Sequence, residues 1–533
     1  FVAGALYAFS SNKMLYASLG QFNIASSQWI PFYVLILLKI TRNANGEWRM
    51  AIRYGFLLGL FLLFQSLSEF IFASFLIIFT ILYLIYRLLA TRLKLITDYR
   101  LLITFLVAAL TFVIPMLPIL AAMIQDMLTE GDFIQRGLGF ADVFSNDVLG
   151  FFVPSHLHPI FGALETQFHF AYTNFAYLGF AALLLAVIAL WKVPQARIWG
   201  IFGAIFVLLT LGPDLNVNGT AISAPYLPFN LLLDLPFIKG NRYPSRWSVM
   251  VTLALAVMGG YGVAWASQKL HLPLRAVQGK VKSQKWPLLF AASLSLLILF
   301  EHLSIPLPTS NFQIPAVYQT IAQDQGDFTV LEIPLAWRNG FRMTGTLDAE
   351  MMFEQWYQTA QRHPILGGNT SRNPELKFQY FTEAPVINSL IALETGHTLD
   401  DATRQRDREL APAVLRFFGV RYVVWHSPRD PQNRRALDAA RAYAQSVLPV
   451  TKISEVSDDT GETVVFRVND APAASGSTMI RADDPMARLN FAEGWGALGG
   501  ASIWATRRDA KMFVRVDEPQ DATMTIRFFT PTA

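Results

Sequence analysis

The sequence of 533 residues contains no cysteine. Disulfide bonds, zinc sites with cysteine ligands and thiol catalysis are therefore excluded. Charged residues are also scarce, at 15% of the chain, whereas soluble domains usually carry about 25%. Hydrophobic residues make up 53%, and 42 residues are phenylalanine. This balance is typical of a protein that crosses the membrane several times.

The part of the sequence after residue 304 lacks long apolar runs, whereas the part before it contains many. Each run has about 17–22 residues, a length that spans the hydrocarbon core of a bilayer. The sequence predicts an α-helical polytopic membrane domain over residues 1–303. We expect about eight spans, near residues 24–40, 51–68, 70–90, 101–121, 175–192, 197–213, 247–266 and 286–303.

The two ends of the sequence lie within structured-looking segments. Phe1 falls inside an apolar run, and the last residues follow directly on a strand-like segment. We therefore expect this chain to be a fragment that lacks the N-terminal membrane helices of a longer protein.

Basic residues gather in every second connection between the predicted spans. They are Lys39, Arg42, Arg49, Arg53, Arg87, Arg92, Lys94, Arg100, Lys192, Arg197, Lys269, Arg275, Lys280, Lys282 and Lys285. Loops that stay in the cytoplasm carry an excess of Lys and Arg. The pattern predicts that these connections are cytoplasmic and that the C-terminal half of the chain is extracytoplasmic.

The C-terminal half has the patterns of two smaller domains. Residues 304–470 predict an extracytoplasmic α/β domain, and residues 471–533 predict a partial β-sandwich. The predicted strands of the α/β domain are 328–335, 420–426 and 463–468, and its clearest predicted helix is 434–448. The β-sandwich is predicted from alternating segments at 501–506, 511–516 and 523–529.

A cationic segment, K-G-N-R-Y-P-S-R-W at 239–247, precedes the seventh predicted span. The predicted topology places Lys239, Arg242 and Arg246 on the external face, where the orientation rule does not favour cations. Either they extend to lipid headgroups, or they bind an anionic ligand. The planar guanidinium of arginine matches the geometry of phosphate. These three residues are therefore our candidates for phosphate or lipid binding.

Several segments, in this order, resemble one family. They include F-V-P-S-H-L-H-P-I-F-G (152–162), Y-L-G-F-A-A-L-L-L (177–185), the cationic segment, H-P-I-L-G-G-N-T-S-R (363–372) and G-V-R-Y-V-V-W-H (419–426). They resemble bacterial polytopic membrane glycosyltransferases of the GT-C class, particularly the YfhO-like group. The resemblance covers most of the chain.

The resemblance implies an enzyme of the bacterial plasma membrane that serves the cell envelope. Such enzymes take a sugar from a polyprenyl-phosphate donor and transfer it to a glycan, lipid or protein acceptor outside the cytoplasm. Membrane lipids are its other expected partners, and no nucleic acid is expected. The family's catalytic Asp or Glu usually lies in the first external loop, which we expect to precede residue 1.

Three carboxylates within the chain are weaker candidates for the catalytic base that deprotonates the acceptor. Glu69 lies in a tight turn between two predicted spans, where it either acts in the reaction or reaches water at the loop tip. Asp142 and Asp147 precede a short apolar segment. They either cap a helix or bind substrate or metal.

No cofactor is certain from the sequence, although a divalent metal ion is possible. His156 and His158 would share one face if their segment were a strand, and could then hold such an ion. Near the first predicted span, Gln21 and Asn23 either bind a sugar or headgroup or satisfy backbone groups. Gly259, Gly260 and Gly262 are expected to permit close helix packing.

Two other functions remain open at this point. One is a transporter or flippase of an anionic lipid or glycan, a class in which broken helices are common. The other is a non-catalytic membrane assembly protein whose external domain binds glycan or a partner protein.

Overall fold

The computed structural model divides into two compact units, Phe1–Thr309 (unit 1) and Ser310–Ala533 (unit 2). The residues it describes are 1–42, 48–90, 99–130, 141–235, 238–269, 285–335, 337–338, 343–370, 375–469, 479–496, 502–506, 509–516, 521 and 523–525. Each unit has its own hydrophobic core.

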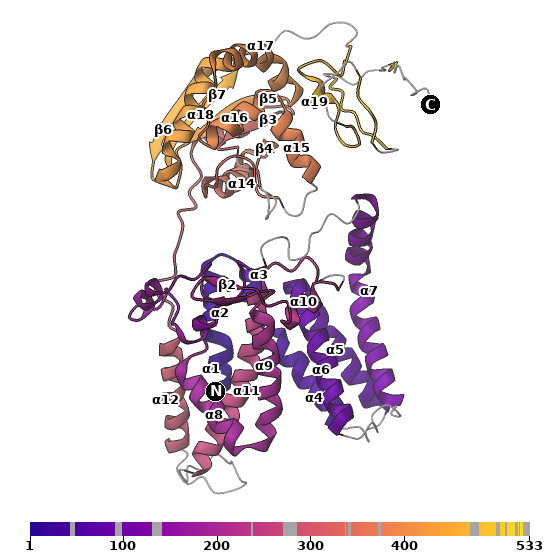
Figure 1. The fold of residues 1–533 in the computed structure, drawn as a ribbon, viewed down its shortest axis with the longest axis vertical. Helices are drawn as coiled ribbons and strands as arrows, with labels where there is room; N and C mark the ends of the chain where they lie inside the picture. Colours follow the sequence, from indigo (N-terminus) through magenta and orange to yellow (C-terminus); the bar gives the residue numbers. More distant parts are fainter. Residues whose placement is uncertain are drawn as a thin grey trace. The chain divides into compact units, whose positions relative to one another are not determined.

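Unit 1 is built almost entirely of helices (Figure 1). The α-helices are α1 (Val2–Phe9), α2 (Ser11–Ser18), α3 (Phe22–Ala25), α4 (Trp29–Arg42), α5 (Trp48–Ser68), α6 (Phe70–Ala90), α7 (Tyr99–Glu130), α8 (Phe180–Lys192), α9 (Arg197–Thr210), α10 (Pro228–Leu232), α11 (Ser248–Lys269) and α12 (Lys285–Glu301). Short 3₁₀ turns and a hairpin join them: η3 (Leu149–Phe152), η4 (Gly162–Gln167), η5 (Pro194–Ala196), η6 (Pro244–Trp247), β1 (Leu215–Val217) and β2 (Thr220–Ile222).

Among the described residues, five helices are long and apolar enough to cross a membrane, so the prediction of eight spans is wrong. They are Phe22–Thr41, Trp48–Ser68, Phe70–Ala90, Tyr99–Thr129 and Pro244–Lys269. The predicted spans at 175–192 and 197–213 form a pair, α8 and α9, bent by 119°. With 13 and 14 residues, each is about 20 Å long, against a hydrocarbon core of about 30 Å. Counting the pair as one span gives six.

The last predicted span, near 286–303, is also shorter than expected. Its described apolar part is the helix Leu289–Glu301, one of the shorter apolar helices of 10–17 residues. A membrane span needs about 20 residues. Hydropathy reports how apolar a segment is, but not how long or how straight the resulting helix will be. The count of membrane-crossing helices therefore depended on where the helices end.

The helix ends of unit 1 are arranged in two sets. In Figure 1, the C-terminal ends of α4, α6, α8 and α11 lie at one end of the unit, and α2, α3 and α10 lie at the opposite end. η6 directly precedes α11 and therefore lies at this opposite end too. Arg87, Lys192 and Lys269 occupy the last turns of α6, α8 and α11. These basic residues thus gather at one end of unit 1. Which end faces the cytoplasm remains a prediction.

An aromatic seam joins α6 to α9 and η6. The ring of Phe75 stacks on Trp247 with 3.6 Å between centroids. One turn further along α6, Phe79 contacts Phe202 at 5.2 Å and Phe206 at 6.3 Å. Offset and edge-to-face aromatic pairs of this kind add to the apolar area that packing buries. The seam therefore fixes the first turns of α6 against the start of α11.

Unit 2 contains a five-stranded mixed sheet in the order β4-β3-β5-β7-β6. The strands are β3 (Thr329–Ile333), β4 (Ile365–Leu366), β5 (Val420–His426), β6 (Val450–Asp458) and β7 (Gly461–Val468). β3 pairs in parallel with β4 and β5, and β7 pairs antiparallel with β5 and β6. Its α-helices are α13 (Val317–Gln323), α14 (Glu350–Gln361), α15 (Glu375–Glu383), α16 (Ile387–Glu394), α17 (Asp401–Phe417), α18 (Arg434–Val447) and α19 (Ala487–Asn490).

The predicted strands and helix of the α/β domain are confirmed by β3, β5, β7 and α18. β4 and β6 were not predicted. β4 has only two residues, and β6 is a largely exposed edge strand that carries the charged Lys452 and Glu455. Charges on an edge strand discourage pairing with other chains, but they also hide the apolar alternation that marks a strand.

The partial β-sandwich does not form in the described part of residues 479–525. That part holds α19 and two isolated bridges, Phe491 with Met512 and Trp495 with Ala505. Alternating residues make a stable strand only when neighbouring strands pair with it and cover one face. Here Phe513 and Val514 are about half exposed. Residues 526–529, the end of the last predicted strand, lie outside the described residues.

α17 offers a direct test of a helix cap in unit 2. The side chain of Asp400 accepts a hydrogen bond of 2.8 Å from the backbone N–H of Thr403. Replacing such a cap with alanine leaves an N–H group at the start of the helix without its partner. We expect Asp400→Ala to lower the midpoint of unfolding of unit 2, measured by denaturant titration. An unchanged midpoint would contradict the assigned cap.

Candidate functional site

The cationic segment folds into the start of α11. The side-chain oxygen of Asn241 accepts a hydrogen bond of 3.1 Å from the N–H of Tyr243, which turns the chain. Pro244 then opens η6, a position where its missing N–H costs nothing. The N–H of Ser245 donates to the carbonyl of Phe144 at 3.2 Å. This fixes the backbone between Arg242 and Arg246.

The ring of Tyr243 gathers the two arginines. Phe144 stacks on this ring with 4.1 Å between centroids. The guanidinium carbons of Arg246 and Arg242 lie 4.5 Å and 5.0 Å from the ring centroid. Both distances fit cation–π attraction. We call Tyr16, Arg242, Tyr243 and Arg246 the cationic cluster; Lys239 lies half-buried in the turn that precedes it.

Arg246 is the member of the cluster with unused hydrogen-bonding capacity. Its Nε atom is buried and has no hydrogen-bond partner in the part of the chain that the structure describes. A buried N–H without an acceptor costs about 1–3 kcal/mol, and more when the group is charged. An anion that placed an oxygen against Nε would remove this cost.

Tyr16 of α2 completes the cationic cluster. Its ring stacks on Phe175 at 4.3 Å, and its hydroxyl oxygen lies 3.4 Å from the hydroxyl oxygen of Ser245. Burial raises the pKa of Tyr16 to about 12, while the positive charge of Arg246 acts in the opposite direction. Tyr16 is therefore a neutral hydroxyl next to a guanidinium at physiological pH.

A second polar group lies at the turn between α5 and α6. Glu69 accepts hydrogen bonds from the backbone N–H of Ile71 and from the side-chain amide of Asn23. Gln65 donates to the carbonyl of Ser26 at 2.9 Å. The side-chain oxygens of Gln65 and Gln21 are buried and have no donor among the described residues. We call Gln21, Asn23, Gln65 and Glu69 the Glu69 cluster.

The two clusters are linked by short stretches of chain. α2 carries Tyr16 of the cationic cluster, and the N–H of Gln21 in the Glu69 cluster donates to the carbonyl of Tyr16 at 2.9 Å. Phe75, six residues after Glu69 on α6, stacks on Trp247, the neighbour of Arg246. Both clusters therefore belong to the end of unit 1 where α2 and α3 lie (Figure 1).

Asp142 and Asp147 lie in the loop before α8 and have different surroundings. Asp142 is exposed, and its backbone carbonyl accepts from the side chain of Asn216. Asp147 is buried, with Oδ1 accepting from the N–H of Leu149 and Oδ2 from the N–H of Gly219. The carboxylate of Asp147 thus binds the backbone at the start of η3 and fastens it to the turn of the β1–β2 hairpin.

His156 and His158 do not lie on one face of a strand, because residues 155–161 form turns and irregular chain with no strand. The Nε2 atom of His158 lies 2.8 Å from the carbonyl oxygen of Phe300, and Nδ1 accepts from the N–H groups of Ile160 and Phe161. His156 is about half exposed, and its ring lies 3.4 Å from Glu165. Hydrogen bonding to Glu165 raises the pKa of His156.

Metal binding finds little support in this arrangement. Both ring nitrogens of His158 already have protein partners, which leaves no lone pair for an ion. Across the described ranges, no group of three or more His, Asp or Glu side chains has a geometry that could hold a metal ion.

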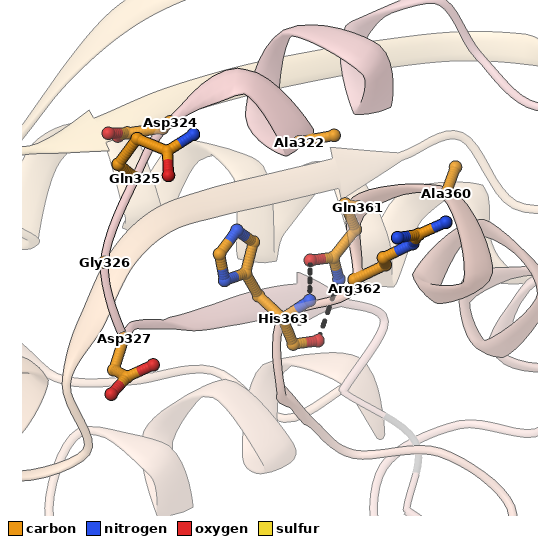
Figure 2. A pocket seen from close by; sticks show the side chains of 9 residues that line it. All are labelled: Ala322, Asp324, Gln325, Gly326, Asp327, Ala360, Gln361, Arg362 and His363. Carbon is orange, nitrogen blue, oxygen red and sulfur yellow. Dashed lines mark hydrogen bonds between the residues drawn. The ribbon is translucent and has the colours of Figure 1, made fainter.

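Unit 2 has a polar cavity of about 400 Å³ (Figure 2). Its lining residues are Ala322, Asp324, Gln325, Gly326, Asp327, Ala360, Gln361, Arg362 and His363. Gln361 accepts from the N–H of His363 at 2.7 Å and donates to its carbonyl at 3.2 Å. Asp324 is occupied by Arg421 and Tyr422. Much of the polar lining thus already forms hydrogen bonds within the protein. This cavity is therefore a weaker candidate for ligand binding than the two clusters.

The aromatic and amide members of the site were missed or left open by sequence reasoning. Tyr16 and Phe144 lie more than 90 residues before Tyr243 in the sequence, and no motif connects them. Gln21 and Asn23 are candidates from the sequence, but the contact of Asn23 with Glu69 depends on how α3 packs. The one sequence feature that could point to these residues is a polar side chain at the end of an apolar run.

Comparison with models of known protein families found no match, and no curated protein sequence matches the chain. The protein has several helices that can cross a membrane, with the cationic cluster and the Glu69 cluster at one end of them, and a second unit with a mixed sheet.

Proposed function

We propose that this protein is a membrane glycosyltransferase that takes a sugar from a polyprenyl-phosphate carrier. The observation that carries the proposal is the buried Nε of Arg246, which lacks an acceptor among the described residues; the Arg246 guanidinium also shares the Tyr243 ring with that of Arg242. A lipid phosphate supplies the missing acceptor oxygens and a matching charge. When the sugar leaves, negative charge grows on that phosphate, and the guanidinium stabilises it.

The Glu69 cluster supports a sugar-binding role next to the phosphate. The buried side-chain oxygens of Gln21 and Gln65 need hydrogen-bond donors, and sugar hydroxyl groups are donors. Glu69 is the ionisable group of this cluster and is half-buried. In the proposed reaction it orients or deprotonates a hydroxyl, either as the base itself or beside a base from another part of the full-length protein.

The proposal also includes the location of the protein and its orientation in the membrane. The enzyme resides in the bacterial plasma membrane, and its clusters and unit 2 face away from the cytoplasm. The gathering of basic residues at the opposite end of unit 1 supports this orientation. The acceptor is a glycan, lipid or protein on the outer side.

The test is consumption of a polyprenyl-linked sugar by the full-length protein in proteoliposomes. Donors with several sugars are supplied together with membrane lipids, and transfer is followed by loss of the lipid-linked sugar. Turnover above protein-free vesicles supports the proposal, and no turnover with any donor contradicts it.

A second candidate function is transport or flipping of an anionic lipid or glycan. The observation in its favour is the sharp bend of 119° between α8 and α9, because transporters use broken helices to form binding sites. The same proteoliposomes separate the two functions: movement of the labelled lipid across the membrane without covalent transfer of its sugar identifies a transporter.

A further inference from the structure

Unit 2 buries a group of ionisable side chains that the proposed reaction does not use. Glu332 of β3, Glu350 and Glu354 of α14, and Glu394 of α16 are each 0–1% exposed. The other charged or titratable groups near Glu354 are Tyr318 of α13, Asp348 before α14, Tyr357 of α14, His426 at the end of β5, and Arg429 after it.

Most carboxylates in this group have donors. Glu332 accepts from the hydroxyl of Tyr318, and its Oε2 lies 3.4 Å from Nε2 of His426. Glu350 accepts from the guanidinium of Arg429, and its Oε1 lies 3.6 Å from Nδ1 of His426. The carboxylates of Glu332 and Glu350 therefore have hydrogen-bond donors within the fold.

The carboxylates of Asp348 and Glu394 also accept hydrogen bonds. Asp348 accepts from the backbone N–H groups of Glu350, Arg429 and Asp430. Glu394 accepts from the backbone N–H of Leu335 at 2.6 Å. Their carboxylates fasten backbone segments to one another and keep their charges close to Glu354.

Glu354 differs from all of them. Its side chain is fully buried, and neither carboxylate oxygen has a hydrogen-bond partner among the described residues. A charged carboxylate in such a place is far less stable than a neutral carboxylic acid, because the charged form has lost its water without gaining a donor. We propose that Glu354 is a proton-dependent latch: α14 stays packed on the sheet of unit 2 while this carboxyl carries a proton, and loosens when the proton is lost.

The electrostatics agree with this geometry and fix the sign of the pH effect. Burial, followed by repulsion from Glu332 and Glu350, raises the pKa of Glu354 well above its ordinary value near 4.5. The unfolded chain releases this proton near pH 4.5, whereas the folded unit keeps it. Stability is therefore greatest below that pH and declines as pH rises through the higher folded pKa. The decline is up to tenfold in the folding equilibrium constant per pH unit.

Glu332 acts in the same direction, because burial also raises its pKa. The latch would link the order of α14 to the acidity of the compartment that unit 2 faces. It is independent of glycosyl transfer, since no residue of the two clusters in unit 1 takes part.

The test is hydrogen exchange of the full chain in detergent micelles at pH 5 and pH 8, followed by mass spectrometry and corrected for the intrinsic pH dependence of exchange. In the wild type, we expect amides of α14 to be protected at least about tenfold less at pH 8 than at pH 5. Glu354→Gln removes the titrating group and should reduce this difference to about threefold or less, the remainder coming from Glu332.

Two further variants make the result decisive. Glu354→Met removes both the charge and the unpaired polar atoms, and should give the same weak pH response even if the glutamine variant folds poorly. Glu409→Gln, at an exposed site on α17, is the matched control and should respond as the wild type does. The proposal is overturned if α14 in the wild type is equally protected at both pH values, or if the Glu354 variants keep the full response.

Discussion

The Arg246→Ala variant is expected to consume a polyprenyl-linked sugar about 10²- to 10³-fold more slowly than the wild type, as loss of one group that stabilises transition-state charge typically does. Arg246 combines a buried Nε that lacks an acceptor among the described residues with a fixed position 4.5 Å from the centroid of the Tyr243 ring. In the proposed reaction, alanine at this position removes a buried guanidinium donor from the departing phosphate.

The size of the effect should separate binding from chemistry. If Arg246 acts mainly on the departing phosphate, kcat falls more than KM rises, because the interaction strengthens as the sugar–phosphate bond breaks. Arg246→Lys keeps the charge but not the planar set of donors, and we expect it to recover only part of the rate. Proteoliposome assays at several donor concentrations give both parameters.

Arg53→Ala is the matched control for Arg246→Ala. Arg53 is an exposed cation near the start of α5, in the first connection predicted to be cytoplasmic. Its replacement removes the same charge from unit 1 and should leave turnover within about twofold of the wild type. Turnover of Arg246→Ala equal to that of Arg53→Ala would show that Arg246 has no part in the reaction.

The Gly262→Ala variant is expected to destabilise unit 1 by about 1–3 kcal/mol, the usual cost of overpacking, or by more if the helices separate. A Cβ atom at Gly262 of α11 would stand 2.3 Å from the backbone oxygen of Leu185 in α8. Backbone atoms cannot rotate away as a flexible side chain can, so the two helices must move apart. Thermal unfolding in detergent measures the loss.

The same helix provides its own control. A Cβ atom at Gly260 would meet only the Cβ of Ala3, at 3.6 Å, an ordinary van der Waals distance. Gly260→Ala should therefore unfold at the wild-type temperature or slightly above it, since alanine favours helices more than glycine does. If both variants were destabilised equally, the close contact between α8 and α11 would not explain the effect of Gly262→Ala.

The glycines of α11 also show what their spacing in the sequence does not predict. Gly259, Gly260 and Gly262 were predicted together to permit close packing, but the nearest atoms to a Cβ at Gly259 and Gly260 are 4.0 Å and 3.6 Å away. Conversely, a Cβ at Gly55 or Gly59 of α5 would stand 2.5 Å or 2.4 Å from backbone oxygens of α7. Spacing alone does not tell which side of a helix meets a neighbour.

The sequence likewise predicted only part of the arrangement of the cationic segment. The arrangement of Arg242, Pro244 and Arg246 at the start of a span was visible in the sequence, because cations next to an apolar run are unusual on the predicted external face. The grouping of both guanidiniums on Tyr243, and the packing of Phe144 on that ring, was not visible. Phe144 comes from a loop about 100 residues earlier.

The sequence by itself determined the properties that depend on neighbours along the chain: which segments are apolar enough for a membrane, which segments alternate as strands, and where basic residues collect. Only the tertiary structure decided that α8 and α9 are too short to be separate spans, that Tyr16 meets Ser245, and that Glu354 is buried without a donor among the described residues. The physical reason is that burial and hydrogen bonding are set by residues distant in sequence, whose approach depends on the packing of the whole unit.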